Sequence, residues 1–142
     1  MYKKTFGDLI TGDSIYYVDY CELEDCFKIY EYSIIVSDNT LEKDKYIVIE
    51  TIIKPGFPLK HRYSGFLLPK NDSEKVIRSS YNNITGNDYF FADYQYAKEK
   101  CTHLMFKLCE KKREKAVKAF EEYNVCWNKL KRYYEDDKIM KG

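Results

Sequence analysis

The fold of this 142-residue chain is decided at residues 89–100, which read YFFADYQYAKEK. An aromatic, strand-like run ends at Ala92, and the Asp93 side chain can then cap a helix by accepting from the exposed N–H groups of its first turn. All three prolines and five of the six glycines lie at or before Gly86, and neither residue occurs between Gly86 and Gly142. The sequence therefore predicts two regions, a small barrel-like domain over 1–92 and a helical region over 93–142.

Residues 1–92 predict short antiparallel strands separated by turns. Aromatic and β-branched residues in alternation favour strands at 13–19, 26–37, 45–53, 62–68 and 88–92. Residues 70–83 leave two alternatives open, either a short helix capped near Ser73 that runs to Ser80 or a loop that carries a strand. So many short strands in so short a region suggest a small, strongly curved barrel or meander.

Two segments resemble known families. The opening FGDLITGDSIY (residues 6–16) resembles the start of SH3-like small barrels, where a phrase of the type F-x-x-G-D-x-I-Y leads from a turn into the first long strand. This resemblance covers about residues 5–69 and implies an SH3-like barrel. The 89–100 segment is similar to small uncharacterised proteins of tailed phages from gut anaerobes, in which a short barrel precedes the same phrase. That likeness implies a phage origin and carries no known chemistry.

The region 93–142 predicts one long helix. Apolar residues recur at heptad spacing in a first run, Ala97, Cys101, Leu104 and Leu108, and in a second run, Ala116, Phe120, Tyr123, Trp127, Leu130 and Tyr134. The gap of eight between the runs breaks the register as a stutter does. With no Gly or Pro to mark a loop, one helix that changes its contact partner is favoured over two antiparallel helices. The predicted class is therefore α+β, a small curved antiparallel barrel or meander followed by a long C-terminal helix packed on the barrel or on a partner.

Charge and composition set the expected compartment. The formal net charge is +1, which comprises −3 over residues 1–92 and +4 over residues 93–142. No apolar stretch resembles a secretory signal or approaches the roughly 20 residues that span a bilayer. Five cysteines, an odd number, favour reduced thiols. We expect a cytoplasmic protein, in the host cell or the virion if it is phage-encoded, with no membrane association.

Few residues have the spacing that catalysis or metal binding requires. His61 and His103 stand apart without a metal-binding motif, with His61 expected on a loop or strand edge. Cys21 and Cys26 flank an acidic segment, but no second pair completes a zinc site, so we interpret them as thiols of a hairpin loop. No nucleophile elbow or phosphate-binding loop is present. We predict no catalytic residue, metal, cofactor or small-molecule substrate; an enzyme with an unrecognised acidic site remains an alternative.

Lysines in the helical region offer a second alternative, nucleic-acid binding. Residues 98–118 carry eight basic and three acidic side chains, a net charge of +5. The candidate contacts to phosphates are Lys107, Lys111, Lys112, Arg113, Lys115 and Lys118. A solvated helix face with Glu–Lys pairs explains the same pattern, and an A+T-rich genome explains 20 lysines against 4 arginines. Nucleic-acid binding is therefore the second hypothesis.

Aromatic residues lead to the favoured hypothesis, since Tyr and Trp are enriched where proteins meet. The chain holds 15 Tyr and 8 Phe. Candidate interface residues are Tyr16, Tyr30 and Tyr32 in the strands and Phe120, Tyr123, Trp127, Leu130 and Tyr134 in the helix. We interpret the protein as a non-catalytic protein–protein interaction module, a phage structural or assembly protein or an inhibitor of a host machine. Its partner is another protein or a second copy of itself.

Overall fold

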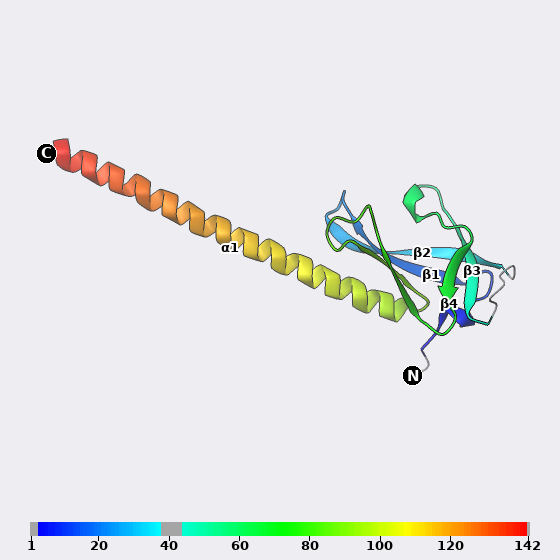
Figure 1. Ribbon diagram of the computed structural model, residues 1–142. Coiled ribbons are helices and arrows are strands. Elements are labelled where there is room, and N and C mark those ends of the chain that lie inside the picture. Colours follow the sequence, from blue (N-terminus) through cyan, green and yellow to red (C-terminus); the bar gives the residue numbers. More distant parts are fainter. Residues whose placement is uncertain (1–2, 38–43, 142) are drawn as a thin grey trace. The chain divides into compact units, whose positions relative to one another are not determined.

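The computed structural model describes residues 3–37 and 44–141, with side chains as far as residue 135. The elements in chain order are η1 (Phe6–Asp8), β1 (Ser14–Cys21), β2 (Cys26–Ser37), β3 (Tyr46–Ile52), η2 (Leu59–His61), β4 (Phe66–Pro69), β5 (Glu74–Arg78), β6 (Asn87–Phe91) and α1 (Tyr94–Lys141). The strands follow the order β4-β3-β2-β1-β6-β5, all neighbours are antiparallel, and the sheet curls into a nearly closed barrel (Figure 1). The predicted α+β class, a small barrel followed by one long helix, is confirmed.

Two expectations about the strands are resolved. The 70–83 region carries a strand, β5, and the alternative of a capped helix is wrong. β4 begins at Phe66 rather than at residue 62, because the chain turns through Gly65 at a φ of 66°, a left-handed conformation that favours glycine. Tyr63 still touches the sheet before that turn, since its carbonyl accepts from the Thr51 N–H at 2.9 Å.

Alternate side chains of the strands fill the barrel. Ile15 and Tyr17 of β1 and Tyr32 and Ile34 of β2 are each at most 1% exposed and belong to one apolar cluster. The Phe90 ring from β6 packs against aromatic rings from three other segments, at centroid distances of 4.6 Å to Tyr17, 5.0 Å to Tyr63 and 5.1 Å to Phe66. These aromatic contacts join β4, at one edge of the sheet, to β6 and β1.

The first helical turn, η1, fastens one end of the barrel to the β4–β5 connection. The Phe6 N–H donates to the Asp72 carbonyl at 2.8 Å, and the Gly7 N–H donates to the Lys70 carbonyl at 2.9 Å. A Cβ on Gly7 would lie 2.9 Å from that Lys70 oxygen, so no larger residue fits without displacement. The two edge strands also meet, because the Lys75 ammonium of β5 donates to the Leu67 carbonyl of β4 at 2.6 Å.

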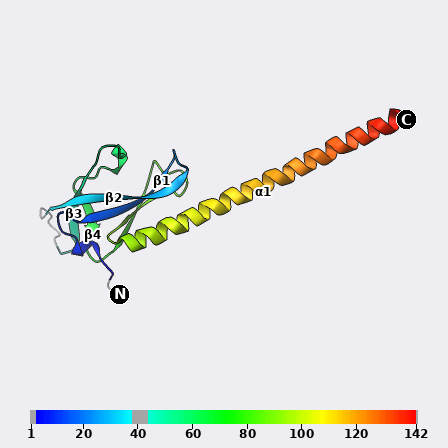
Figure 2. The same cartoon turned by 180° about the vertical axis from the view of Figure 1, so that it is seen from behind.

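The long helix starts as the sequence predicts and belongs to two compact units, Met1–Met105 and Phe106–Gly142. The Asp93 carboxylate accepts from the Gln95 N–H at 2.8 Å and thereby caps the first turn. Within the first unit, Cys101 Sγ lies 3.4 Å from the Phe27 carbonyl, and Met105 Sδ accepts from the Phe27 N–H at 3.0 Å. The predicted boundary at 92/93 marks the change from strand to helix, whereas the first three turns of α1 go with the barrel. α1 is unbroken to Lys141 (Figure 2).

Candidate functional site

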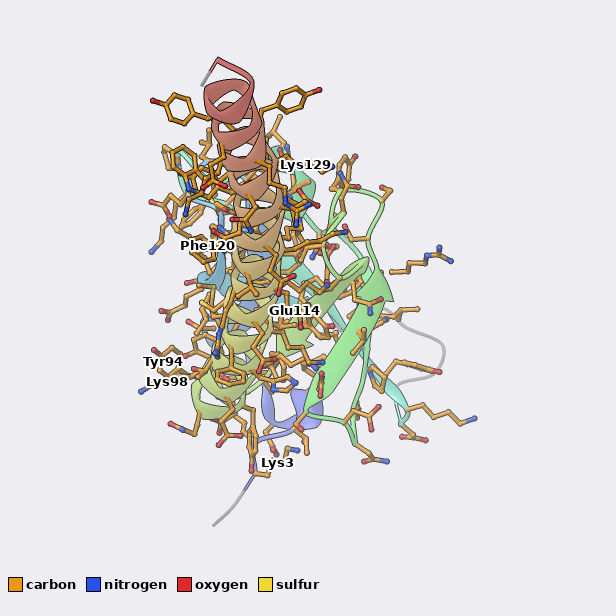
Figure 3. The ribbon with its side chains drawn as sticks, turned by 90° about the vertical axis from the view of Figure 1, so that its left-hand side faces the viewer. Lys3, Tyr94, Lys98, Glu114, Phe120 and Lys129 are labelled. Carbon is orange, nitrogen blue, oxygen red and sulfur yellow. The ribbon has the colours of Figure 1, made fainter. Side chains whose placement is uncertain are left out.

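The second unit presents a row of large apolar side chains, which we call the aromatic seam. It consists of Phe120, Tyr123, Trp127, Leu130 and Tyr134. These residues recur every three or four positions and so share one face of α1. Their exposed fractions lie between 52% and 71%, and the Phe120 and Tyr123 rings stack at 6.5 Å. Figure 3 shows Phe120 projecting from the opposite side of α1 to Lys129. All five helical interface candidates therefore lie on one exposed surface.

The three candidate tyrosines of the strands do not form a comparable surface. Tyr32 is 1% exposed inside the barrel, so its assignment as an interface residue is wrong, since no partner can reach it. The Tyr30 ring packs against His61 at 4.6 Å, and burial raises the pKa of its hydroxyl to about 12. The Tyr16 ring packs edge-on against Tyr94 of α1 at 5.5 Å. Strand position alone does not reveal which face of a closed barrel a tyrosine occupies.

The six basic candidates are all exposed along α1. Lys107, Lys111, Lys115 and Lys118 follow one another at intervals of four, four and three residues and form a single row. Lys112 and Arg113 lie on other faces of the helix. Only four of the six candidates could therefore contact one nucleic-acid backbone together.

Sequence reasoning missed a buried polar network inside the barrel. His61, expected on a loop or strand edge, is fully enclosed. Its Nε2 lies 2.8 Å from Asp19 Oδ2, its Nδ1 lies 2.5 Å from the Tyr32 hydroxyl, and the Lys60 ammonium lies 2.9 Å from the same Asp19 oxygen. The four residues come from β1, β2 and η2, which the sequence does not place together. The one available signal was an acidic residue at an inward position of β1.

Hydrogen bonds govern the charge of Asp19. Burial by itself would raise the pKa of the Asp19 carboxyl, but hydrogen bonds from His61 and Lys60 outweigh burial and lower it. Asp19 and His61 are at most 1% exposed, so they offer a bound molecule almost no surface, although Asp19 contributes to the wall of the cleft beside the network. The network therefore acts on the barrel, where it fixes η2 against β1 and β2.

A second buried carboxylate, Asp88 of β6, is less well satisfied. Its Oδ1 has no hydrogen-bond partner although the residue is only 6% exposed. Burial raises the pKa of Asp88, and hydrogen bonds from the hydroxyls of Tyr17 and Ser79 offset only part of that effect. Burial also raises the pKa of the Tyr17 hydroxyl above its ordinary value. Asp88 thus carries an uncompensated desolvation cost in its ionised form.

Beside the network, a cleft of about 290 Å³ opens between the β1–β2 hairpin and η2. Its walls include Tyr20, Glu22 and Tyr81, with Lys60 beside them. The Lys60 ammonium is already bonded to Asp19 and lies 5.8 Å from the centre of the Tyr81 ring. Of the charged residues in the cleft wall, Asp19 and Lys60 are bonded to each other, so the exposed Glu22 is the charged side chain that the wall offers to a ligand.

The two cysteines of the hairpin lie at the facing ends of β1 and β2 rather than in the loop between them. Cys21 and Cys26 face each other across β1 and β2 and are free thiols. Within residues 3–37 and 44–135, no group of three or more His, Cys, Asp or Glu side chains could hold a metal ion. Across the same described part of the chain, no helix is both long and apolar enough to cross a membrane.

Comparisons of the chain with known proteins found no relative. No protein-family model matches the chain, and neither the curated proteins nor the solved structures yield a significant match.

Proposed function

We propose that this chain is a non-catalytic protein-interaction module, in which the barrel is the scaffold and the aromatic seam binds an amphipathic helix. The observation that carries the proposal is the exposure of the seam, five large apolar side chains in a continuous row that are all more than half accessible. Apolar surface of this kind is favourably removed from water, and a helix with the same heptad spacing is the shape that fits it.

Position-specific photo-crosslinking in cells tests the proposal. A photoreactive phenylalanine analogue replaces Tyr123 in the seam or, as a matched control, Val125, which is also exposed but lies outside the seam. We expect one discrete covalent adduct from position 123 and none from position 125. Equal labelling at the two positions, or no adduct at position 123, contradicts the proposal. The mass of the adduct shows whether the partner is a second copy or another protein.

The lysine row supports a second candidate function, binding to nucleic-acid phosphates. Four aligned lysines can contact about four phosphates, so the affinity for duplex DNA would fall with salt with a log–log slope of about −3.6. Fluorescence anisotropy with a labelled duplex at several salt concentrations measures this slope. The variant Lys111→Gln/Lys115→Gln should halve it, and Arg113→Gln, on another face of the helix, should leave it unchanged. Absence of binding at low salt rules this candidate out.

A further inference from the structure

The heptad register of the seam extends further along the helix than the five aromatic and apolar residues. Counting back from Phe120 in steps of seven and from Tyr123 in the same way reaches Phe106 and Cys109, which are both exposed. The core positions a are Phe106, Arg113, Phe120, Trp127 and Tyr134, and the core positions d are Cys109, Ala116, Tyr123 and Leu130. The register spans just over four heptads, of which residues 109–134 hold nearly four, enough for a stable coiled coil, and Arg113 is the one charged residue at a core position.

The residues that flank this core are mostly uncharged. Positions e and g between residues 117 and 133 are Val117, Ala119, Asn124, Cys126, Lys131 and Tyr133. Charges of that segment lie chiefly on the far side of the helix, as Lys118, Glu121, Glu122, Lys129 and Arg132. A second helix can therefore approach the seam without burying a band of charge.

A parallel pair of identical helices conflicts with this pattern. In a parallel pair in register, position a meets position a, so Arg113 would face the partner's Arg113 in the interface. Two like charges at close range in a partly desolvated core are destabilising.

An antiparallel pair removes this conflict. Its two-fold axis repeats every contact, because a residue i that meets the partner's residue j requires j to meet the partner's i. With Phe120 opposite the partner's Tyr123, Trp127 lies opposite the partner's Ala116, so the largest core residue meets the smallest. In the same alignment Arg113 lies opposite the partner's Leu130, where its aliphatic stem can pack and its charge can reach water.

Charge complementarity supports the same alignment. Position e of one helix lies beside position e of the other, which places Glu110 next to the partner's Lys131 and, by symmetry, Lys131 next to the partner's Glu110. These are the only two charged residues at position e between 110 and 131 of the chain, and their signs are opposite.

We propose that the seam pairs with the seam of a second copy of this chain as an antiparallel two-stranded coiled coil over residues 109–134. The proposal rests on the proposed function, for which it names the partner. The seam is self-complementary in size and charge, a property that binding to an unrelated protein does not require.

The mass of the purified full chain, measured by sedimentation over a concentration series, is the first test. We expect a monomer–dimer equilibrium, with a blue shift in the emission of Trp127, the single tryptophan, as the dimer forms. Phe120→Glu should weaken dimerisation by more than about 100-fold, whereas Val125→Glu on the opposite side should change it less than about threefold. Thermal unfolding of the barrel serves as the folding control for both variants. A monomer at every concentration, or a trimer or tetramer, overturns the proposal.

Orientation is tested by cross-linking through cysteine. In the antiparallel alignment, position 119 lies beside the partner's Cys126, so Ala119→Cys/Cys109→Ser should form covalent dimers with a short bismaleimide. Adding Cys126→Ser should abolish them. In a parallel pair Cys109 would instead face the partner's Cys109, and rapid disulfide dimers of the unmodified chain through Cys109 would overturn the antiparallel arrangement.

Charge reversal tests the alignment itself. Glu110→Lys and Lys131→Glu should each weaken dimerisation about fivefold, and the double variant should restore it to within about twofold. If the double variant instead shows the sum of the two losses in dimerisation free energy, the alignment is wrong. The photo-crosslinking experiment distinguishes the two proposals. An adduct from position 123 whose mass is not twice that of the chain would contradict pairing with a second copy but would still support the interaction module.

Discussion

The barrel and the C-terminal part of α1 are both rich in aromatic residues, and they place them in opposite environments. In the barrel, Tyr17, Tyr32 and Phe90 are almost fully buried among other rings. In the second unit, Phe120 and Trp127 are more than half exposed. The strands bury their own rings because the sheet curls back on itself, whereas a single helix cannot cover its own apolar face. The comparison separates aromatic residues that stabilise the fold from those that are available to a partner.

The largest expected effect contrasts one phenylalanine from each region. Phe90→Ala removes a ring that contacts three others in the core and should lower the free energy of unfolding of the barrel by about 3–5 kcal/mol. Phe120→Ala removes an exposed ring and should change it by no more than about 0.5 kcal/mol. Urea denaturation, followed by circular dichroism in the near ultraviolet, measures both. Similar losses of unfolding free energy in the two variants would contradict the distinction between buried and exposed aromatic residues.

The Asp19 network should come next in size. Asp19→Asn weakens the bonds to His61 and Lys60 and should cost about 2 kcal/mol at pH 7, less than a fully enclosed ion pair because Lys60 is partly exposed. The pKa of Asp19 is lowered in the folded state, so its contribution is complete above the unfolded value of about 3.9 and is lost as the pH falls below it.

Denaturation between pH 3 and pH 7 checks this prediction. The difference between the unmodified chain and Asp19→Asn should shrink toward the acidic end of the series. Asp72→Asn, an exposed aspartate of the same unit, is the matched control and should stay within about 0.5 kcal/mol at pH 7. A difference independent of pH would mean that the Asp19 charge contributes nothing to the barrel.

Asp88 should show the opposite sign. Because its pKa is raised in the folded state, its contribution to stability is greatest below about pH 3.9 and is lost as the pH rises through the folded value. Asp88→Asn replaces a poorly satisfied anion by a neutral amide and should stabilise the barrel by about 1 kcal/mol at pH 7. Denaturation at several pH values measures the gain, which should disappear in acid. Destabilisation at neutral pH contradicts the prediction.

Thiol reactivity is the smallest expected effect. Cys109 and Cys126 are exposed in the second unit, while Cys101 is half-buried in the first and burial raises the pKa of its thiol. In dilute solution Cys109 and Cys126 should react with a maleimide before Cys101, as followed by mass spectrometry of the peptides. Pairing of the seam would slow Cys109 as the concentration rises and leave Cys101 unchanged. Faster labelling of Cys101 would show that the first unit opens readily.

Local patterns identified those features that depend on neighbours in the chain. The cap at Asp93, the uninterrupted helix and most strands follow from residue type and spacing over a few positions. The β4 boundary was missed because a glycine turn at Gly65 shortens the strand. The burial of Tyr32, taken as an interface candidate, and of His61, expected on a loop or strand edge, was missed because a strand or loop position does not say which side of a barrel it faces.

The sequence by itself determined the change from strand to helix after Ala92, the long helix, and the heptad register of Phe120, Tyr123, Trp127, Leu130 and Tyr134, since periodicity is a local property. Only the tertiary structure decided the partners of Asp19 and the incomplete hydrogen bonding of Asp88, because these depend on contacts between residues as far apart as 42 positions, as in the Asp19–His61 pair. Burial, and with it the pKa of a carboxyl group or the accessibility of a ring, is set by the closure of the sheet and not by the residues on either side.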